Sequence, residues 1–267
     1  MEGNDGMDIN KMKDKVAVVT GAAGGIGQTV VEKLAENGVI VAAVDKDAVA
    51  LARFVNTMNE KGLQASAFPV DISDHVAVDE IIAAIERDIG PIEILINVAG
   101  VLHLDSVESL KKADWDATFA VNTTGVFHVS QSVSGRMIPR RKGTIVTVSS
   151  NAANIPRMSM AAYAASKAAA TMFTKCMGLE LAQYNIRCNI VSPGSTETEM
   201  LKMLWKDEHG ERETIEGLSN TYRVGIPLQK IAKPTDVAEA VLFFASDQAA
   251  HITMQDVCVD GGATLGV

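Results

Sequence analysis

The sequence predicts a single α/β domain, in which a doubly wound, parallel sheet of about seven strands carries helices on both faces. Short β-branched runs alternate along the chain with segments of helical periodicity. These runs are apolar throughout, as is typical of strands buried on both faces. The chain has 267 residues, of which 47% are hydrophobic, and this length and composition suit one large domain.

The first elements are the clearest. Val16–Thr20 predicts a strand that runs directly into a glycine-rich turn. The next segment predicts a helix, because four apolar residues share one of its faces: Val30, Val31, Leu34 and Ala35. Gly38 stands where that helix ends, and Val39–Val44 predicts the second strand. A second amphipathic helix is marked by Leu51, Phe54, Val55 and Met58.

The same alternation continues to the C-terminus, with no linker, repeat or low-complexity segment. Five more strands are predicted, with helical patterns between most of them: ASAFPV (65–70), IEILINV (92–98), GTIVTVSS (143–150), IRCNIVS (186–192) and QDVCVD (255–260). We therefore expect one domain over residues 14–267, and we expect residues 1–13 to form a disordered tail.

Composition excludes several classes of function. The net charge of −9 disfavours nucleic acid or an anionic membrane as a partner, and no apolar run is long enough to span a bilayer. The polar N-terminus has no apolar signal core, so we expect a cytoplasmic protein. The cysteines Cys176, Cys188 and Cys258 lie in apolar segments and predict buried free thiols. The five histidines form no pair at ligand spacing, so no metal site is expected.

The turn after the first strand has the sequence TGAAGGIG, in which Gly21, Gly25 and Gly27 open a helix. Glycine lets a pyrophosphate approach the backbone, and the helix N-terminus offers unpaired N–H groups. Asp45 ends the second strand, where a carboxylate accepts hydrogen bonds from the adenosine ribose and repels a 2′-phosphate. The pattern predicts a dinucleotide site that prefers NAD to NADP.

Further motifs occur in a specific order: VDI (70–72), NVAG (97–100), VN (121–122), Ser150, YAASK (163–167) and PGSTET (193–198). Together with the glycine turn they resemble the short-chain dehydrogenase/reductase family, over almost the whole chain. The resemblance implies a Rossmann domain and an NAD-dependent oxidoreductase. Val98 departs from the family pattern, because an asparagine is usual there.

The resemblance implies four catalytic residues. Tyr163 is expected to be the general acid/base, supported by Lys167, and their spacing of four places both on one helical face. Ser150 is expected to hydrogen-bond the reacting oxygen, although its neighbour Ser149 is chemically equivalent. Asn122 is expected to tie a water chain to Lys167. The cofactor-binding residues that the family pattern implies are Gly21, Gly25, Ile26, Gly27, Asp45, Asp71, Ile72, Asn97, Ala99, Gly100, Tyr163, Lys167, Pro193, Gly194, Thr196 and Thr198.

A narrower resemblance exists within the family. The segments NIRCNIVSPGSTETEM, KPTDVAEAVLF and HITMQDVCVDGGATLGV are similar to 2,3-dihydro-2,3-dihydroxybenzoate dehydrogenases of catechol siderophore biosynthesis. This resemblance implies a carboxylated cyclic diol as substrate and a homotetramer. The substrate residues expected are Arg157, Ser150, Met160 and His103. Arg157 is expected to bind the ring carboxylate. His103 stands where relatives carry arginine, and it is also able to donate a hydrogen bond to a carboxylate.

Two alternatives stay open at this point. One is another activity in the family, such as the reduction of a 3-oxoacyl thioester, which does not require a cation beside the reacting carbon. The other is a protein that senses NAD without catalysis. The full set of Ser150, Tyr163, Lys167 and Asn122 argues against a sensor, since a sensor needs no base.

Overall fold

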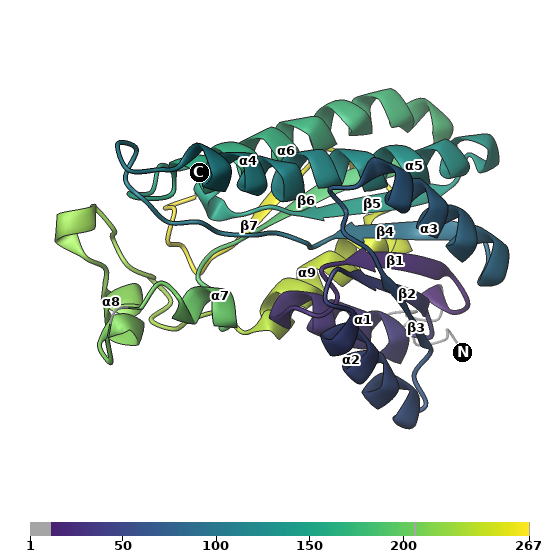
Figure 1. Cartoon of the computed structure of the whole chain (residues 1–267), viewed down its shortest axis with the longest axis horizontal. Coiled ribbons are helices and arrows are strands. Elements are labelled where there is room, and N and C mark those ends of the chain that lie inside the picture. Colours follow the sequence, from purple (N-terminus) through teal and green to yellow (C-terminus); the bar gives the residue numbers. More distant parts are fainter. Residues whose placement is uncertain (1–11, 206, 267) are drawn as a thin grey trace, which may run out of the picture.

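A single sheet organises the computed structural model, which describes residues 12–205 and 207–266. All seven strands are parallel, in the order β3-β2-β1-β4-β5-β6-β7 (Figure 1). The strands are β1 (Val16–Thr20), β2 (Ile40–Asp45), β3 (Ala65–Pro69), β4 (Ile92–Asn97), β5 (Gly143–Val148), β6 (Ile186–Pro193) and β7 (Asp256–Val259). The predicted fold class is confirmed, and each strand lies within two residues of its predicted position.

Helices cover both faces of the sheet (Figure 1). The main helices are α1 (Gly25–Glu36), α2 (Ala48–Glu60), α3 (His75–Asp88), α4 (Lys112–Phe119), α5 (Val126–Arg140), α6 (Ala161–Leu181), α7 (Glu199–Lys202), α8 (Gly210–Glu216) and α9 (Pro234–Ala245). One hydrophobic core joins α1, α2 and α9 to the sheet, and a second joins α3, α5 and α6 to the opposite face. This two-sided burial explains why the central strands are largely apolar.

The order of the strands creates a crevice at one edge of the sheet. β1 pairs with β2 on one side and with β4 on the other, so the chain winds outward in opposite directions from β1. Thr20, the last residue of β1, stands in register with Val44 of β2 and Asn97 of β4. Ligands of doubly wound sheets bind at this reversal, beyond the carboxyl ends of the strands.

Two expectations drawn from the sequence need correction. Residues 1–11 of the expected tail lie outside the described residues, but Met12 is only 3% exposed and packs in the core. The packed domain therefore includes residues that we had placed in the tail. Of the three cysteines, Cys188 is buried, whereas Cys176 is exposed and Cys258 is intermediate. Cys176 projects outward from α6, because an apolar sequence around a residue does not fix the face on which it lies.

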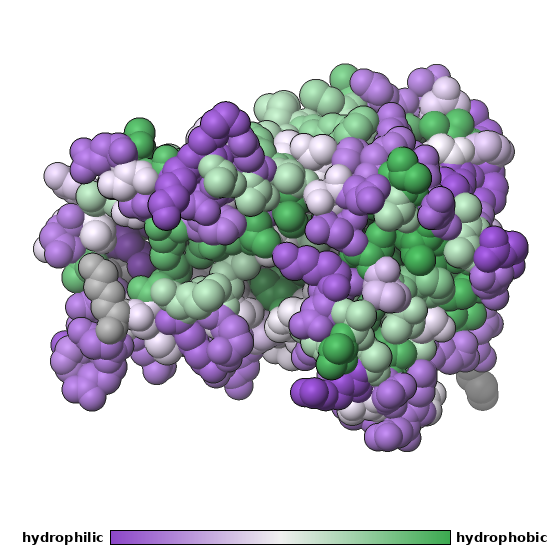
Figure 2. Space-filling view, viewed as in Figure 1, coloured by the Kyte–Doolittle hydropathy of each residue, from purple (hydrophilic) through white to green (hydrophobic). Residues whose placement is uncertain are grey.

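The segment that carries α7 and α8 stands away from the sheet, on the left of the molecule in Figure 1. Figure 2 shows a hollow between this segment and the loop that follows β4, with hydrophobic side chains gathered inside it. Within the described residues, no helix combines the length and apolar character needed to span a bilayer.

Candidate active site

A cavity of about 1410 Å³ opens at the carboxyl ends of the strands. Its wall begins at the turn between β1 and α1 and continues through the ends of β2 to β6 to the segment of α7 and α8. Most of the predicted site residues line it: Gly21, Gly25, Ile26, Gly27, Asp45, Asp71, Ile72, Ala99, Gly100, Ser150, Arg157, Met160, Tyr163, Lys167, Pro193, Gly194, Thr196 and Thr198. Asn97, Asn122 and His103 do not line it.

The glycine turn is packed so closely that side chains do not fit. A Cβ on Gly27 would lie 2.0 Å from the carbonyl oxygen of Gly21. Gly21 itself has φ of +68°, and its Cβ would lie 2.6 Å from the backbone of Ala99. Helix α1 begins directly after Gly24, and no side chain caps its first N–H groups. This bare helix N-terminus, facing a large cavity, fits the pyrophosphate of a dinucleotide.

Asp45 closes the same end of the cavity. One of its carboxylate oxygens accepts a hydrogen bond of 3.0 Å from the amide of Ala23, and the other accepts one of 3.0 Å from the amide of Asp47. These two bonds fix the carboxylate at the end of β2, beside the glycine turn. The charge is thus placed where an adenosine ribose reaches when the pyrophosphate lies on α1.

Asp71 and Ile72 follow β3 on the neighbouring wall. Hydrogen bonds from the amide and hydroxyl of Ser73 lower the pKa of Asp71, so that its carboxylate stays charged. Ile72 is 5% exposed, and its carbonyl oxygen lies 3.1 Å from Nδ1 of His128. The pair therefore combines an apolar side chain with a fixed charge, a surface suited to an adenine ring and its edge.

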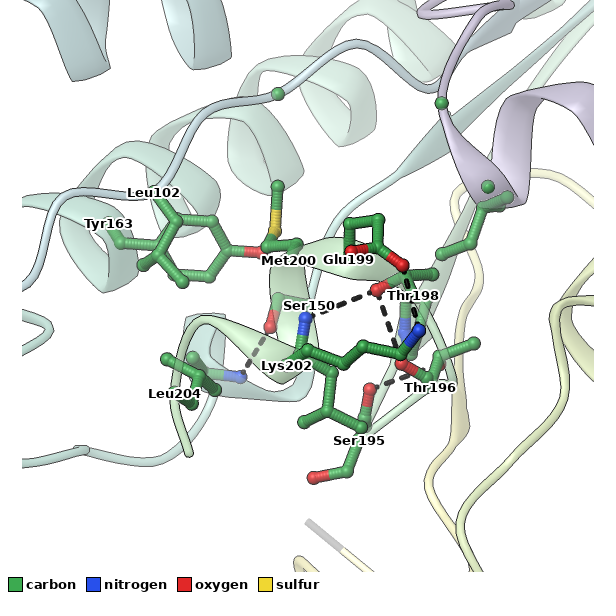
Figure 3. Close-up of a pocket in the computed structure, with 18 of the residues that line it drawn as sticks. Leu102, Ser150, Tyr163, Ser195, Thr196, Thr198, Glu199, Met200, Lys202 and Leu204 are labelled. Carbon is green, nitrogen blue, oxygen red and sulfur yellow. Dashed lines mark hydrogen bonds and ion pairs between the residues drawn. The ribbon is translucent and has the colours of Figure 1, made fainter. Parts of the chain in front are cut away.

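Tyr163 and Lys167 lie one turn apart on α6, as their spacing predicts. The amine of Lys167 lies 5.9 Å from the centroid of the Tyr163 ring and donates a hydrogen bond of 3.0 Å to the carbonyl of Val148. One of the three N–H donors is thus used by β5. Figure 3 shows the ring of Tyr163 pointing into the pocket toward Met200 of α7.

The structure distinguishes the two adjacent serines. The hydroxyl of Ser149 is buried and bonds to Thr171 and to the carbonyl of Lys167. The hydroxyl of Ser150 accepts a bond of 3.1 Å from the amide of Ala152, and its own proton remains available to Tyr163. Of the two, only the Ser150 hydroxyl is placed beside the tyrosine.

Burial shifts the proton affinities of both groups on α6. It raises the pKa of Tyr163, while the hydrogen bond with Ser150 acts in the opposite direction. It lowers the pKa of Lys167 from 10.5 to about 8. Both shifts have one physical cause, since removal from water disfavours the charged form of either group. Such perturbed groups in a cavity are typical of catalytic sites.

Asn122 lies behind this pair, in a π-helical turn (Ala120–Gly125) between α4 and α5. Its side chain accepts a hydrogen bond from the amide of Val101 and donates to the carbonyl of Val101 and to Ser166. A Cβ on Gly100 would lie 3.3 Å from the Lys167 amine and 3.4 Å from the Asn122 oxygen. Asn122 thus fixes the loop after β4 beside Lys167. π-Helical turns within α-helices are frequent at functional sites.

The remaining predicted residues divide into those on the cavity wall and those beneath it. Thr198 caps α7 and its methyl group packs near Gly25, so the segment of α7 closes over the glycine turn. Asn97 is buried and donates to Ser130, but its side-chain oxygen has no partner among the described residues. His103 turns to Thr118, with its Nδ1 3.0 Å from the hydroxyl.

Sequence reasoning missed much of the far wall. Leu204, Trp205, Thr214 and Arg223 line the cavity together with Arg157 and Met160. The first four of these residues come from the segment of α7 and α8, which carries neither a motif nor strong periodicity. A signal was nevertheless present, because Arg223 is a lone cation that precedes the strand-like run VGIPL.

Comparisons with known proteins agree with this geometry. The family described as short chain dehydrogenase matches residues 15–209. The chain belongs to this short-chain dehydrogenase family. It is 58% identical over 261 residues to a 2,3-dihydro-2,3-dihydroxybenzoate dehydrogenase of Bacillus subtilis, a match that covers 98% of this chain and 100% of the relative. It is 42% identical to the vibriobactin-specific 2,3-dihydro-2,3-dihydroxybenzoate dehydrogenase of Vibrio cholerae, over 97% of this chain and 98% of the relative.

Solved structures place the chain in the same family. A gluconate 5-dehydrogenase from Burkholderia cenocepacia, in complex with NADP and tartrate, superimposes with a TM-score of 0.89 at 30% identity. The match covers 97% of this chain and 99% of the other. As a short-chain dehydrogenase, the chain is an oxidoreductase built on a Rossmann fold.

Proposed function

We propose that the protein oxidises 2,3-dihydro-2,3-dihydroxybenzoate to 2,3-dihydroxybenzoate with NAD, a step in the biosynthesis of catechol siderophores. The observation that carries this proposal is the 58% identity to a dehydrogenase of that name over nearly the full length of both chains. The cavity supports it, because Ser150, Tyr163 and Lys167 line it together with Arg157 and Arg223.

The glycine turn and α1 would hold the pyrophosphate of NAD, Asp45 would bind the adenosine ribose, and Asp71 and Ile72 would flank the adenine. On the other side, Ala99, Gly100, Pro193, Gly194, Thr196 and Thr198 border the nicotinamide half. Asn97 supports this wall from beneath. When bound, NAD supplies the positively charged acceptor for a hydride.

Tyr163 acts as the general base. Its phenolate accepts the proton of one substrate hydroxyl as the hydride leaves the same carbon. Ser150 donates a hydrogen bond to the reacting oxygen, because the Ala152 amide already occupies one lone pair of its own oxygen. The immediate product is a ring ketone, and its tautomerisation gives an aromatic catechol. Aromaticity therefore drives the oxidation forward.

Lys167 makes the tyrosine a usable base. A free phenol has a pKa near 10, and burial raises that of Tyr163 further. An ammonium on Lys167 favours the phenolate, and with a pKa of about 8 most of the lysine is charged at neutral pH. Its remaining N–H donors would hold the nicotinamide ribose of bound NAD. Asn122 fixes the loop beside Lys167 through its two hydrogen bonds with Val101. The family pattern implies that it would also tie a water chain to the lysine amine.

Arg157 binds the ring carboxylate, and Met160 packs against the ring. The carboxylate adjoins the diol, so a bidentate arginine contact turns one carbinol hydrogen toward the cofactor. His103 is 3.0 Å from the Thr118 hydroxyl, which itself donates to the carbonyl of Asp114. The imidazole therefore donates from Nδ1 to Thr118, and its role is to support the loop after β4 rather than to bind the substrate.

The direct test is the appearance of NADH absorbance when the purified protein and NAD receive the dihydrodiol acid. Cyclic alcohols, a 3-oxoacyl thioester with NADH, and NADP in place of NAD serve as comparisons. Turnover with the acid well above that with the other substrates supports the proposal. Preferential reduction of the thioester would assign a different activity in the family, and NAD binding without any turnover would indicate a sensor.

We also propose that the protein is a homotetramer of the cytoplasm. The two long helices α5 and α6 carry exposed apolar side chains, with Phe127 39%, Met172 59% and Leu179 69% exposed. Leu265, near the C-terminus, is 75% exposed. Apolar groups on adjacent helices fit an interface between copies. Light scattering on the purified protein tests the tetramer, and cell fractionation tests the location.

A further inference from the structure

Arg223 is a second arginine on the wall of the cavity that holds Arg157. It lies in the turn after α8, where its backbone makes two hydrogen bonds with Leu218, of 2.9 and 3.1 Å. The preceding residue, Tyr222, has φ of +55°. These features fix the point from which the Arg223 side chain leaves the backbone, and so they fix its approach to the cavity.

The two arginines act on each other. Burial lowers the pKa of both side chains, and the charge of Arg223 lowers that of Arg157 further, whereas Asp260 opposes this effect. Among the described residues, neither guanidinium has a carboxylate oxygen within the 4.0 Å of an ion pair. Two half-buried like charges near one another are unfavourable unless an anion compensates them.

The hydrogen-bond capacity of both groups is almost unused. Arg223 donates one long bond of 3.5 Å to Ser195, and the Arg157 side chain makes no hydrogen bond with the described residues. A guanidinium carries five N–H donors, and a carboxylate offers about four acceptor positions on its two oxygens. One carboxylate is therefore able to satisfy donors from both arginines at once.

We propose that Arg157 and Arg223 together bind the ring carboxylate of the substrate, and that Arg223 determines specificity for a carboxylated ring. The inference rests on the proposed function. Arg157 comes from the loop between β5 and α6, which also carries Ser150, whereas Arg223 comes from the turn after α8. A carboxylate between them is held from two sides, which fixes the rotation of the ring as well as its position.

The pair also explains how neutral substrates are rejected. A neutral diol leaves both guanidinium groups without an anion, although it fills the same apolar space. Sites that hydrogen-bond a substrate group discriminate strongly against analogues without it, because their own polar groups are then left unpaired. A single arginine gives less discrimination, since one charge alone is more easily compensated by solvent.

The test compares Arg157→Gln, Arg223→Gln and the double variant on two substrates, the carboxylated cyclic diol and the same diol without the carboxylate. We expect each single variant to lower kcat/KM for the acid by about 10- to 100-fold and to change the neutral diol less than about 3-fold. The double variant should lose less than the product of the single losses, because both arginines bind one group. Arg223→Lys should recover part of the loss.

Arg212→Gln is the matched control, since Arg212 is an exposed arginine on α8 that pairs with Glu216 at 4.0 Å. It removes the same charge from the same segment and should leave both substrates unchanged. Equal losses for both substrates in Arg223→Gln would overturn the proposal. Inhibition or binding of benzoate in the presence of NAD provides a second measurement, with weakening of about 10-fold expected in each arginine variant.

The two proposals fail in different ways. If the unaltered protein does not oxidise the dihydrodiol acid, the proposed function is wrong, but benzoate binding still tests the arginine pair. If the acid is oxidised and benzoate binds equally well to Arg223→Gln, the arginine pair is wrong and the proposed function stands. Thermal unfolding of each variant identifies any loss that comes from misfolding.

Discussion

Lys167 and Tyr163 share one face of α6, with the lysine amine 5.9 Å from the centroid of the tyrosine ring. Burial disfavours the ammonium of one residue and the phenolate of the other. An ammonium and a phenolate attract each other, however, so each ion reduces the cost of forming the other. The pair is therefore able to accept and release a proton. The burial of these two ionisable groups lowers the stability of the fold.

The first prediction concerns the base. Tyr163→Phe removes the phenolic hydroxyl, which is hydrogen-bonded to Ser150, and keeps the aromatic ring. We expect kcat to fall by about 10²- to 10⁴-fold while the affinity for NAD stays within about 3-fold. Steady-state kinetics and a fluorescence titration with NAD measure the two effects. Tyr184→Phe, which changes a tyrosine stacked near Arg141, should be neutral. Near-normal kcat in Tyr163→Phe would contradict the assignment.

The second prediction concerns the choice of cofactor. Asp45→Ser removes the carboxylate that lines the cavity at the end of β2. We expect the unaltered protein to prefer NAD, and the variant to lose that preference or invert it, because a 2′-phosphate no longer meets a negative charge. The measurement is kcat/KM for both cofactors. Asp47→Ser is the control: it removes the same charge two residues away, and serine still caps α2. Equal use of both cofactors by the unaltered protein would refute the prediction.

The third prediction concerns stability. The native pKa of Lys167 is about 8, below the unfolded value of 10.5, so the unfolded chain binds more protons between these pH values. The contribution of Lys167 to the free energy of unfolding therefore rises with pH across this window and is most unfavourable below about pH 8. Lys167→Met should stabilise the protein by about 2 kcal/mol at neutral pH, after loss of the bond to Val148.

This gain should shrink as the pH rises from about 8 to about 10.5. Urea unfolding at fixed protein concentration, at about pH 7 and about pH 9.5, measures it. Lys230→Met, at an exposed lysine without an ion pair among the described residues, should show no such dependence. A pH-independent difference would show that burial of the charge is not the cause.

The fourth prediction concerns the glycine turn. Gly27→Ala places a Cβ 2.0 Å from the carbonyl oxygen of Gly21, where only a backbone shift relieves the contact. We expect a loss of at least about 2 kcal/mol of stability and NAD binding weakened more than 10-fold. Gly135→Ala in α5 adds the same methyl group with nothing within 4 Å, and it should stabilise the protein by about 0.5 kcal/mol. Calorimetry and a NAD titration distinguish the two variants.

The central strands were predictable because they are buried on both faces and so are largely apolar. Val16–Thr20 is the clearest example, with every residue buried. The N-terminal boundary of the domain was harder to predict, since Met12 is a lone apolar residue in a polar stretch. Only the tertiary structure shows that it packs against the core. The predicted burial of Cys176 was wrong for a related reason, because the long helix α6 is apolar on more than its buried face.

The candidate site was predictable where local geometry limits the choice of residue. Gly21 and Gly27 are examples, because their conformation or close contacts exclude a side chain. The far wall was not predictable in this way. Arg223 sits in an irregular turn, and its neighbour in space, Arg157, lies in a distant part of the chain. Only the fold brings the two charges to one cavity, whereas His103, equally plausible from the sequence, turns to Thr118.

The two ends of the segment between β6 and α9 are joined to each other by backbone pairing. Thr196 and Ala232 form a parallel bridge, with the amide of Glu197 2.8 Å from the Ala232 carbonyl. Between these points the chain builds the far wall of the cavity, while the seven strands lie elsewhere. An exchange of this segment that begins after Thr198 would change the far wall while keeping the seven strands and the contact of Thr198 with the glycine turn. Substrate selectivity and the cofactor site are thus separable parts of the chain.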